Sequence, residues 1–369
     1  MKVKLGDVCD RGSSNLKQSD VINQNGQYPV YGAAGLLGNI DSYHQDKPYV
    51  AVVKDGAGIG RVILHPGYSS VIGTLQYLLP KENVLPEYLY YVTKHMHLEK
   101  YYTGATIPHI YFKDYKNEKF NLDAIEKQQH IVDILKKTEN IIESRQQELQ
   151  KLDDLIRARF VEMFGDLANP ECKWNKYPLI NACLNKDDIK CGPFGTQLSK
   201  DEYTAEGIAV WEIPQINMGF QCAPTHFLTE EKANQLEAYS LIPGDIAMSR
   251  KGNVGKCALF PEEYSNGIIH SDVLRIRVDK KNVNPVFMMY QLHFSKAVTR
   301  QIELVSSGAI MAGVNVTKLK QICVHIPPIE LQQKFADFVA QVDKSKATVQ
   351  KALDETQLLF DSLMQQYFG

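Results

Sequence analysis

Residues 123–164 read DAIEKQQHIVDILKKTENIIESRQQELQKLDDLIRARFVEMF, with no proline or glycine before Gly165. At about 1.5 Å per residue, this stretch predicts one helix about 60 Å long. Apolar side chains recur in it every seven residues, at Leu135, Ile142, Leu149, Ile156 and Met163. A weaker row is interleaved with the first, at Ile131, Thr138, Arg145, Leu152 and Arg159. A seven-residue repeat of this kind indicates a coiled-coil seam.

The same pattern returns 204 residues later, at the C-terminal end of the sequence. One row there is Val339, Lys346, Leu353, Phe360 and Tyr367, and the other is Phe335, Val342, Val349, Thr356 and Leu363. The sequences that enter the two helices also match, as IEKQQ at residues 125–129 and IELQQ at residues 329–333. The chain is therefore an internal duplication.

The duplication predicts four segments. Residues 1–122 and 166–328 form two globular domains, and residues 123–165 and 329–369 form two helices. The chain leaves the first helix at its far end and enters the second helix only after the second globular domain. The helices are therefore expected to pair antiparallel, with one domain at each end and pseudo-twofold symmetry.

Composition limits the possible classes of protein. Residues 1–122 carry 13 basic and 11 acidic side chains, and residues 166–328 carry 17 of each, which argues against binding nucleic acid through bulk charge. The seven cysteines are scattered without a C-x-x-C pair, which predicts reduced thiols. No apolar run approaches the ~20 residues of a membrane span, and the first residues lack the apolar core of a signal peptide. We therefore expect a cytoplasmic protein.

Both globular segments show short β-branched and aromatic runs separated by turn residues, which indicates an α+β fold rich in β-structure. In the first segment, strands are predicted at residues 49–53, 61–64 and 75–79, and a helix at residues 86–101. In the second segment, strands are predicted at residues 208–213 and 246–248, and a turn at residues 191–198.

A glycine-rich loop follows one predicted strand in each domain, as KDGAGIGR at residues 54–61 and SRKGNVGK at residues 249–256. The first loop runs into another strand, whereas a dinucleotide fingerprint must open a helix, and neither loop has the G-K-[ST] ending of a P-loop. A simple hairpin turn would explain either loop alone. However, both carry cations, namely Lys54, Arg61, Arg250, Lys251 and Lys256, and glycine permits close approach of the backbone to a ligand.

A second matched segment precedes each long helix, as GATIPH at residues 104–109 and GAIMAG at residues 308–313. Its small residues are expected to close the domain against the base of the helix. The polar members Thr106 and His109 are candidates for contact with a ligand.

Taken in order, these features resemble the specificity subunit of type I restriction-modification enzymes. The resemblance covers essentially the whole chain, and its most specific parts are residues 126–131 (EKQQHI), 158–166 (ARFVEMFGD), 3–8 (VKLGDV) and 195–198 (GTQL). It implies two target-recognition domains, each reading one half of a bipartite site in double-stranded DNA. It also implies spacer helices that dock two methyltransferase subunits, which would hold S-adenosylmethionine, and further restriction/translocase subunits. The chain itself would hold no cofactor or metal. The second domain contains a Gly-Pro-Phe-Gly element at residues 192–195. The first domain departs from it, with YPVYG at residues 28–32 instead.

If the chain reads DNA, the chemistry of the side chains suggests a division of roles. The cations Lys54, Arg61, Arg250, Lys251 and Lys256 are expected to grip phosphates. The amide and imidazole side chains of Gln197, Gln215, Asn217, Asn253 and His109 are better suited to reading bases, and Thr106 remains a contact candidate.

Two other classes of protein compete with this interpretation. A stand-alone adenine methyltransferase would need a [DN]-P-P-[YFW] segment, but the only Pro-Pro pair lies in the sequence IPPI at residues 326–329. No cluster of carboxylates indicates a nuclease, so we expect a non-catalytic chain. A coiled-coil scaffold without sequence-specific DNA binding would explain the heptads equally well, but it leaves the two paired loops unexplained.

Overall fold

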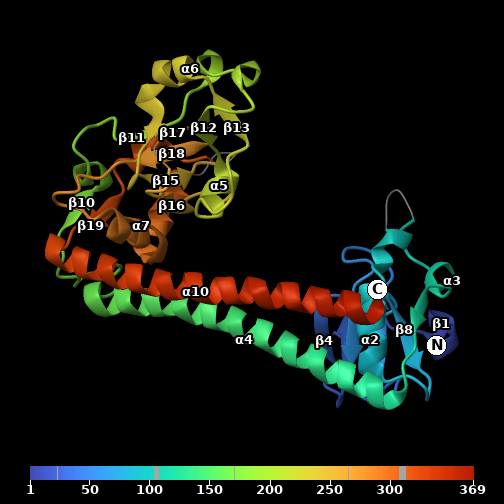
Figure 1. Ribbon diagram of the computed structural model, residues 1–369. Helices are drawn as coiled ribbons and strands as arrows, with labels where there is room; N and C mark the ends of the chain where they lie inside the picture. Colours follow the sequence, from blue (N-terminus) through green and yellow to red (C-terminus); the bar gives the residue numbers. More distant parts are fainter. Residues whose placement is uncertain (23, 104–107, 170, 265, 307–312) are drawn as a thin grey trace. The chain divides into compact units, whose positions relative to one another are not determined.

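The computed structural model describes residues 1–369 except 23, 104–107, 170, 265 and 307–312 (Figure 1). The chain divides into two compact units, Met1–Glu148 with Val349–Gly369 and Leu149–Thr348. The two long helices are α4 (Ile125–Phe164) and α10 (Ile329–Phe368), which start within two residues of the expected boundaries. Each unit thus contains one globular part, the start of one long helix and the end of the other.

The first unit is built on three small sheets. The main antiparallel sheet has the order β2 (Cys9–Ser13), β8 (Leu75–Pro80), β5 (Tyr49–Val53) and β6 (Val62–His65). A three-stranded sheet has the order β4 (Gly35–Ile40), β3 (Tyr28–Gly32) and β7 (Ser70–Val71), and β1 (Lys2–Lys4) pairs with β9 (Lys119–Asn121). The helical elements are α1 (Leu5–Val8), η1 (Gln18–Asp20), α2 (Pro86–His95), η2 (Leu98–Tyr101) and α3 (Phe112–Tyr115).

Strand β5 is buried along its whole length because both of its faces are covered. Successive side chains of a strand point to opposite faces, so Val50 and Val52 join the core that contains Leu89 and Val92 of α2. Tyr49, Ala51 and Val53 join a second core with Val71 of β7. This apolar, β-branched run therefore forms the centre of the first unit.

The second unit repeats this topology. Its main sheet has the order β11 (Ile189–Cys191), β18 (Val273–Ile276), β15 (Ile246–Ser249) and β16 (Cys257–Leu259). A further sheet has the order β13 (His226–Leu228), β12 (Ile208–Trp211), β17 (Gly267–Ile269) and β14 (Ser240–Leu241), and β10 (Lys176–Pro178) pairs with β19 (Cys323–His325). Strands β3 and β7 pair in parallel, and so do their counterparts β12 and β17.

The helical elements of the second unit include counterparts of those in the first. They are η3 (Leu179–Ala182), η4 (Gly195–Gln197), η5 (Lys200–Glu202), α5 (Ile213–Asn217), α6 (Glu230–Gln235), η6 (Glu237–Tyr239), α7 (Pro285–Phe294), α8 (Lys296–Val305) and α9 (Val316–Leu319). Helix α7 takes the place of α2, between the last strand of the main sheet and the strand before the long helix. The α+β class and the duplication are confirmed.

Several predicted elements differ at their ends, and the strands predicted at residues 75–79 and 246–248 each extend one residue further. The helix predicted at residues 86–101 is divided, because His97 adopts a left-handed conformation with φ of 50° between α2 and η2. The strand predicted at residues 61–64 is shifted by one residue. The strand predicted at residues 208–213 stops at Trp211, since Pro214 lies in the first turn of α5, a position that favours a helix start.

Within the first unit, the start of α4 packs against the end of α10. Ile131 and Leu135 share a core with Phe360 and Met364. Further along α4, the guanidinium of Arg145 donates to the carbonyl of Ala352 and the hydroxyl of Thr356. As the residue number rises along α4 it falls along α10, so the pairing is antiparallel.

Within the second unit, the end of α4 packs against the start of α10 in the same direction. Phe160 shares a core with Phe335 and Val339. Further along α10 in the same unit, Lys346 forms an ion pair with Asp153 of α4 at 2.6 Å. The antiparallel seam predicted from the heptad rows is therefore confirmed in both units.

A buried glutamine fixes the start of each long helix. The side chain of Gln128 accepts a hydrogen bond from the N–H of Leu85 at 2.9 Å and donates to the carbonyls of Asn83 at 3.0 Å and Asp123 at 2.8 Å. Its side chain is fully buried. It therefore joins the helix to the chain that enters α2.

Gln332 repeats this arrangement 204 residues later. Its side chain accepts from the N–H of Asn284 at 2.8 Å and donates to the carbonyls of Asn282 at 3.2 Å and Pro327 at 2.6 Å. Each glutamine belongs to the Q-Q pair that the sequence repeats. The physical role of the repeated motif is thus to dock the long helix onto its globular part.

Two kinds of feature are absent from the described parts of the chain. No described helix is both long enough and apolar enough to cross a membrane. Among the same residues, no three His, Cys, Asp or Glu side chains are grouped so that they could hold a metal ion.

Candidate nucleic-acid interface

The two glycine loops occupy the same place in their units, between β5 and β6 and between β15 and β16. Both run into a strand, as predicted for the first loop. Gly60 and Gly255 have left-handed φ values of 81° each. A Cβ atom on Gly60 would lie 2.5 Å from the backbone nitrogen of Glu99, so this position requires glycine for space as well as for conformation.

The backbone hydrogen bonds reveal which residues of the two loops are equivalent. The N–H of Lys54 donates to the carbonyl of Thr74 at 3.0 Å, and its carbonyl accepts from the N–H of Ile110 at 3.0 Å. The N–H of Arg250 donates to the carbonyl of Asp272 at 2.8 Å, and its carbonyl accepts from Val314 at 3.0 Å.

Lys54 and Arg250 are therefore counterparts, although matching Gly60 to Gly255 in the sequence pairs Lys54 with Ser249. Counted from the end of the preceding strand, the first loop spans residues 54–61 and the second spans residues 250–256, so the first loop is one residue longer. In both units, the first residue of the loop is a cation that is hydrogen-bonded to the segment in front of the long helix.

In the first unit, the loop and that segment also meet through side chains. Lys54 lies 3.8 Å from the carboxylate of Asp55, which also pairs with His109. The ring of His109 lies edge-on to Tyr111, with 4.1 Å between the ring centroids. The guanidinium of Arg61 donates to the carbonyl of Ala33 at 3.1 Å. Thr106 lies outside the described residues.

In the second unit, Arg250 and Lys251 have different surroundings. The guanidinium of Arg250 lies over the ring of Phe194, 4.8 Å from its centroid, and its Nε donates to the carbonyl of Val314 at 3.2 Å. Lys251 instead pairs with Asp272 at 2.8 Å. The two neighbouring cations therefore differ in how firmly their charge is already neutralised.

Three polar residues of the second unit are predicted to read bases although they lie outside its glycine loop. These residues, Gln197, Gln215 and Asn217, differ in exposure. Gln197 is exposed, and its side-chain oxygen accepts from the N–H of Phe194 at 3.2 Å and the hydroxyl of Tyr239 at 3.0 Å. Asn217 is half-buried and accepts from the hydroxyl of Ser249 at 3.4 Å. Both remain candidates.

The prediction for Gln215 is wrong. Its side chain is 2 % exposed, and both ends of the amide bind backbone groups. The oxygen accepts from the N–H of Glu212 at 3.2 Å, and the nitrogen donates to the carbonyl of Ala223 at 3.1 Å. Gln215 therefore holds the turn at α5 together and has no free edge to present to a base.

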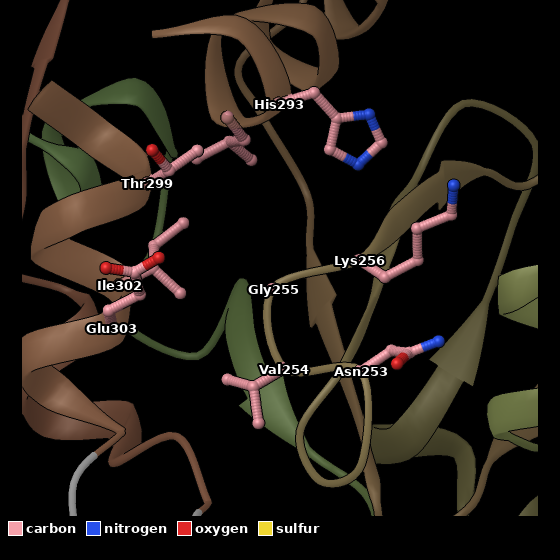
Figure 2. Close-up of a pocket in the computed structure, with 9 residues that line it drawn as sticks. Asn253, Val254, Gly255, Lys256, His293, Thr299, Ile302 and Glu303 are labelled. Carbon is pink, nitrogen blue, oxygen red and sulfur yellow. The ribbon is translucent and has the colours of Figure 1, made fainter. Parts of the chain in front are cut away.

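Asn253 and Lys256 line a cavity of about 390 Å³ beside the second glycine loop (Figure 2). Helix α8 borders it on the other side, with Thr299, Ile302 and Glu303 labelled there in Figure 2. Among the described residues, neither Asn253 nor Lys256 has an ion pair or a side-chain hydrogen bond, so both side chains are available to a ligand.

His293 closes one end of this cavity as a neutral side chain. Its Nε2 atom accepts a hydrogen bond from the N–H of Cys257 at 3.0 Å and lies 3.1 Å from the sulfur of that residue. Burial, and then the charge of Lys256, lowers the pKa of His293 to about 4, and burial raises the pKa of Cys257 to about 12. A thiol with so high a pKa is not a nucleophile at neutral pH.

The low pKa of His293 predicts a loss of stability in acid. The folded state holds this side chain neutral, whereas in the unfolded state it takes up a proton near pH 6.5. The contribution of neutral His293 to the free energy of unfolding is therefore complete above pH 6.5. It declines as the pH falls toward 4 and is about 2 kcal/mol smaller at pH 5. Urea unfolding at pH 8 and pH 5 measures this, with Trp174 and Trp211 reporting on the second unit by fluorescence.

The variant His293→Gln is the matched control, since its side-chain oxygen still accepts from Cys257. We expect its free energy of unfolding to fall less between pH 8 and pH 5 than that of the unmodified chain. Equal falls in the two proteins would contradict the assignment.

Phe194 and Asp55 belong to these sites, although the sequence does not indicate them. Phe194 belongs to the Gly-Pro-Phe-Gly element, where the glycines and the proline predict only a turn. A Cβ atom on Gly192 would lie 2.3 Å from the carbonyl of His270, so the chain at this element packs closely on the turn before β18. Asp55 gave no separate signal, because its partner His109 is 54 residues away.

Comparison with known proteins shows the family and the fold. The family described as type I restriction modification DNA specificity domain matches residues 1–154 and 192–356. Two relatives from Methanocaldococcus jannaschii are similar in sequence. The type I restriction enzyme MjaVIII specificity subunit is 20% identical over 324 residues, covering 82% of this chain and 76% of the relative. The putative type I restriction enzyme MjaX specificity subunit is 24% identical over 148 residues, covering 38% of this chain and only 34% of that relative's length.

A solved structure has a similar fold. The S subunit of a type I restriction-modification system from M. genitalium is 16% identical, with a TM-score of 0.62. The match covers 100% of this chain and 96% of that chain.

Proposed function

Because the chain belongs to the family of type I restriction modification DNA specificity domains, we propose that it reads a bipartite, asymmetric sequence in double-stranded DNA. Each unit supplies one target-recognition domain, and each domain binds one half-site. The chain performs no chemistry itself. It directs two methyltransferase subunits, which hold S-adenosylmethionine, and then restriction/translocase subunits to the site.

The observation that carries this proposal is the repeated loop with a different cation at its first position. The backbones of Lys54 and Arg250 bond to equivalent segments of their units, yet the Lys54 side chain is paired with a carboxylate and that of Arg250 lies over an aromatic ring. Base readout depends on the particular donors and acceptors that enter a groove. Two domains with one framework and different side chains therefore suit two different half-sites.

The remaining cations fit contacts with the DNA backbone. Arg61 and Lys256 lie at the far ends of the two loops, and Lys256 has no ion-pair partner among the described residues. Such contacts fix the position of a protein on the duplex but carry no sequence information. Asn253, Gln197, Asn217 and His109 remain candidates for base contacts.

Selection of bound sequences from randomised duplex DNA tests the proposal, with the full-length chain assembled with its methyltransferase subunit. We expect two specified segments of different sequence, separated by unspecified base pairs. A single continuous site, or a perfectly palindromic one, would contradict a bipartite asymmetric site. Retention of random sequences without any preference would support a coiled-coil scaffold instead.

A further inference from the structure

We propose that Arg250 reads a guanine in the half-site bound by the second unit, with Phe194 and the Val314 carbonyl as positioning groups. The inference rests on the proposed DNA-binding function and changes the role expected for Arg250, which was a phosphate contact. It assigns one residue to one kind of base.

The backbone of Arg250 is held on both sides. Its N–H donates to Asp272 and its carbonyl accepts from Val314, so the start of the loop is joined to the turn before β18 and to the chain before α9. The Cα atom from which the side chain extends therefore has a fixed position. Such support from neighbouring segments is what a residue that reads one base requires.

The side chain of Arg250 is held as well. Its Nε donates to the Val314 carbonyl at 3.2 Å, and its Cζ atom lies over the Phe194 ring, 4.8 Å from the ring centroid. An arginine that lies over an aromatic ring at this distance gains cation–π attraction and loses rotational freedom. The ordering of the long side chain is thus largely complete before DNA binds.

The terminal nitrogens of the guanidinium are left for a ligand. Across the described residues, Arg250 has no carboxylate partner, and its hydrogen bond to Val314 uses only Nε. Two parallel N–H groups in one plane match the O6 and N7 acceptors that guanine presents in the major groove. The same fork also fits a phosphate, so the base preference and the salt dependence of Arg250 variants decide between the two contacts.

Phe194 is suited to holding the Arg250 side chain in position. Its side chain is 45% exposed, although it is a large apolar group. Gln197 accepts from its N–H, and the hydroxyl of Tyr239 binds the same oxygen, so the short helix η4 holds the ring beside Arg250. The first unit has Lys54 at the equivalent position, and we therefore assign the guanine only to the second half-site.

Selection from randomised DNA, followed by binding titrations over a range of salt concentrations, tests the assignment in the full-length chain with its methyltransferase subunit. Arg250→Lys keeps the charge but removes the planar pair of donors. We expect it to lose the preference for guanine at one position of one half-site by about 5- to 150-fold, with the other positions unchanged. Phe194→Leu should weaken the preference at the same position by a smaller factor.

Lys281→Ala is the control, because it removes an exposed cation of the same unit that lies outside the loop and should leave every base preference unchanged. Thermal melting of each variant checks its folding. If Arg250→Lys kept the guanine preference, or if Arg250→Gln weakened binding to all sequences equally and lowered the salt slope by about one, Arg250 would be a phosphate contact and the inference would fail. If the unmodified complex showed no sequence preference, the proposed function would fail with it.

Discussion

Replacing Gln332 by alanine is expected to lower the free energy of unfolding of the second unit by about 3 kcal/mol, because buried backbone groups lose their partners. The N–H of Asn284 and the carbonyls of Asn282 and Pro327 all bind the Gln332 side chain. Each buried group left without a partner costs roughly 1–3 kcal/mol, and the void left by the side chain adds to the loss.

The neighbouring Gln333 provides the matched control. It has the same chemistry one residue along α10, but it is exposed and bonds to Asp337 and Asn284 through side chains only. We expect Gln333→Ala to cost less than about 1 kcal/mol. Urea unfolding followed by tryptophan fluorescence distinguishes the two, since both tryptophans lie in the second unit. Equal losses would show that the hydrogen bonds of Gln332 do not determine the docking of the helix.

Gln128 and Gln129 allow the same comparison in the first unit. Gln128 is buried and Gln129 is exposed, as in the second copy of the motif. Because the first unit contains no tryptophan, amide hydrogen exchange in α2 and at the start of α4 provides the measurement. Faster exchange is expected only in Gln128→Ala.

Deleting seven residues from each long helix is expected to change the number of unread base pairs between the half-sites by about three. The deletions would remove residues 143–149 and 347–353, which correspond at the 204-residue offset of the duplication. Seven residues of helix span ~10 Å, and one base pair of DNA spans about 3.4 Å. Removing whole heptads retains the alternation of the seam rows.

The direction of pairing makes this experiment possible. In each unit, the start of one helix packs against the end of the other, so matched deletions shorten both helices of the pair equally. Selection from randomised DNA should return the same two half-sites with a shorter spacer. Deleting four residues from each helix is the control, because it rotates the seam rows out of register and should impair folding. An unchanged spacer with retained binding would show that the helices do not set the distance.

Much of the fold was predictable because periodicity is a local property of the sequence. The rows through Leu135 and Ile131 repeat at a fixed interval, and the same rows return in α10, so the duplication and the antiparallel seam follow without tertiary information. The ends of elements were less predictable. His97 interrupts a helix through a single left-handed backbone conformation, which histidine adopts only occasionally and which no local pattern predicts.

The candidate site shows where the sequence alone is insufficient. It identified the two glycine loops and their cations, because glycines and charges at a strand end are visible in any alignment of the two halves. Only the tertiary structure established that Lys54 corresponds to Arg250, since the equivalence depends on hydrogen bonds to residues about 20 and 60 positions away. It likewise decided that Gln215 is buried and that Arg250 lies over Phe194. Residue type gives the chemistry of a side chain, but distant segments of the chain determine whether its polar atoms are already bound or are free for a partner.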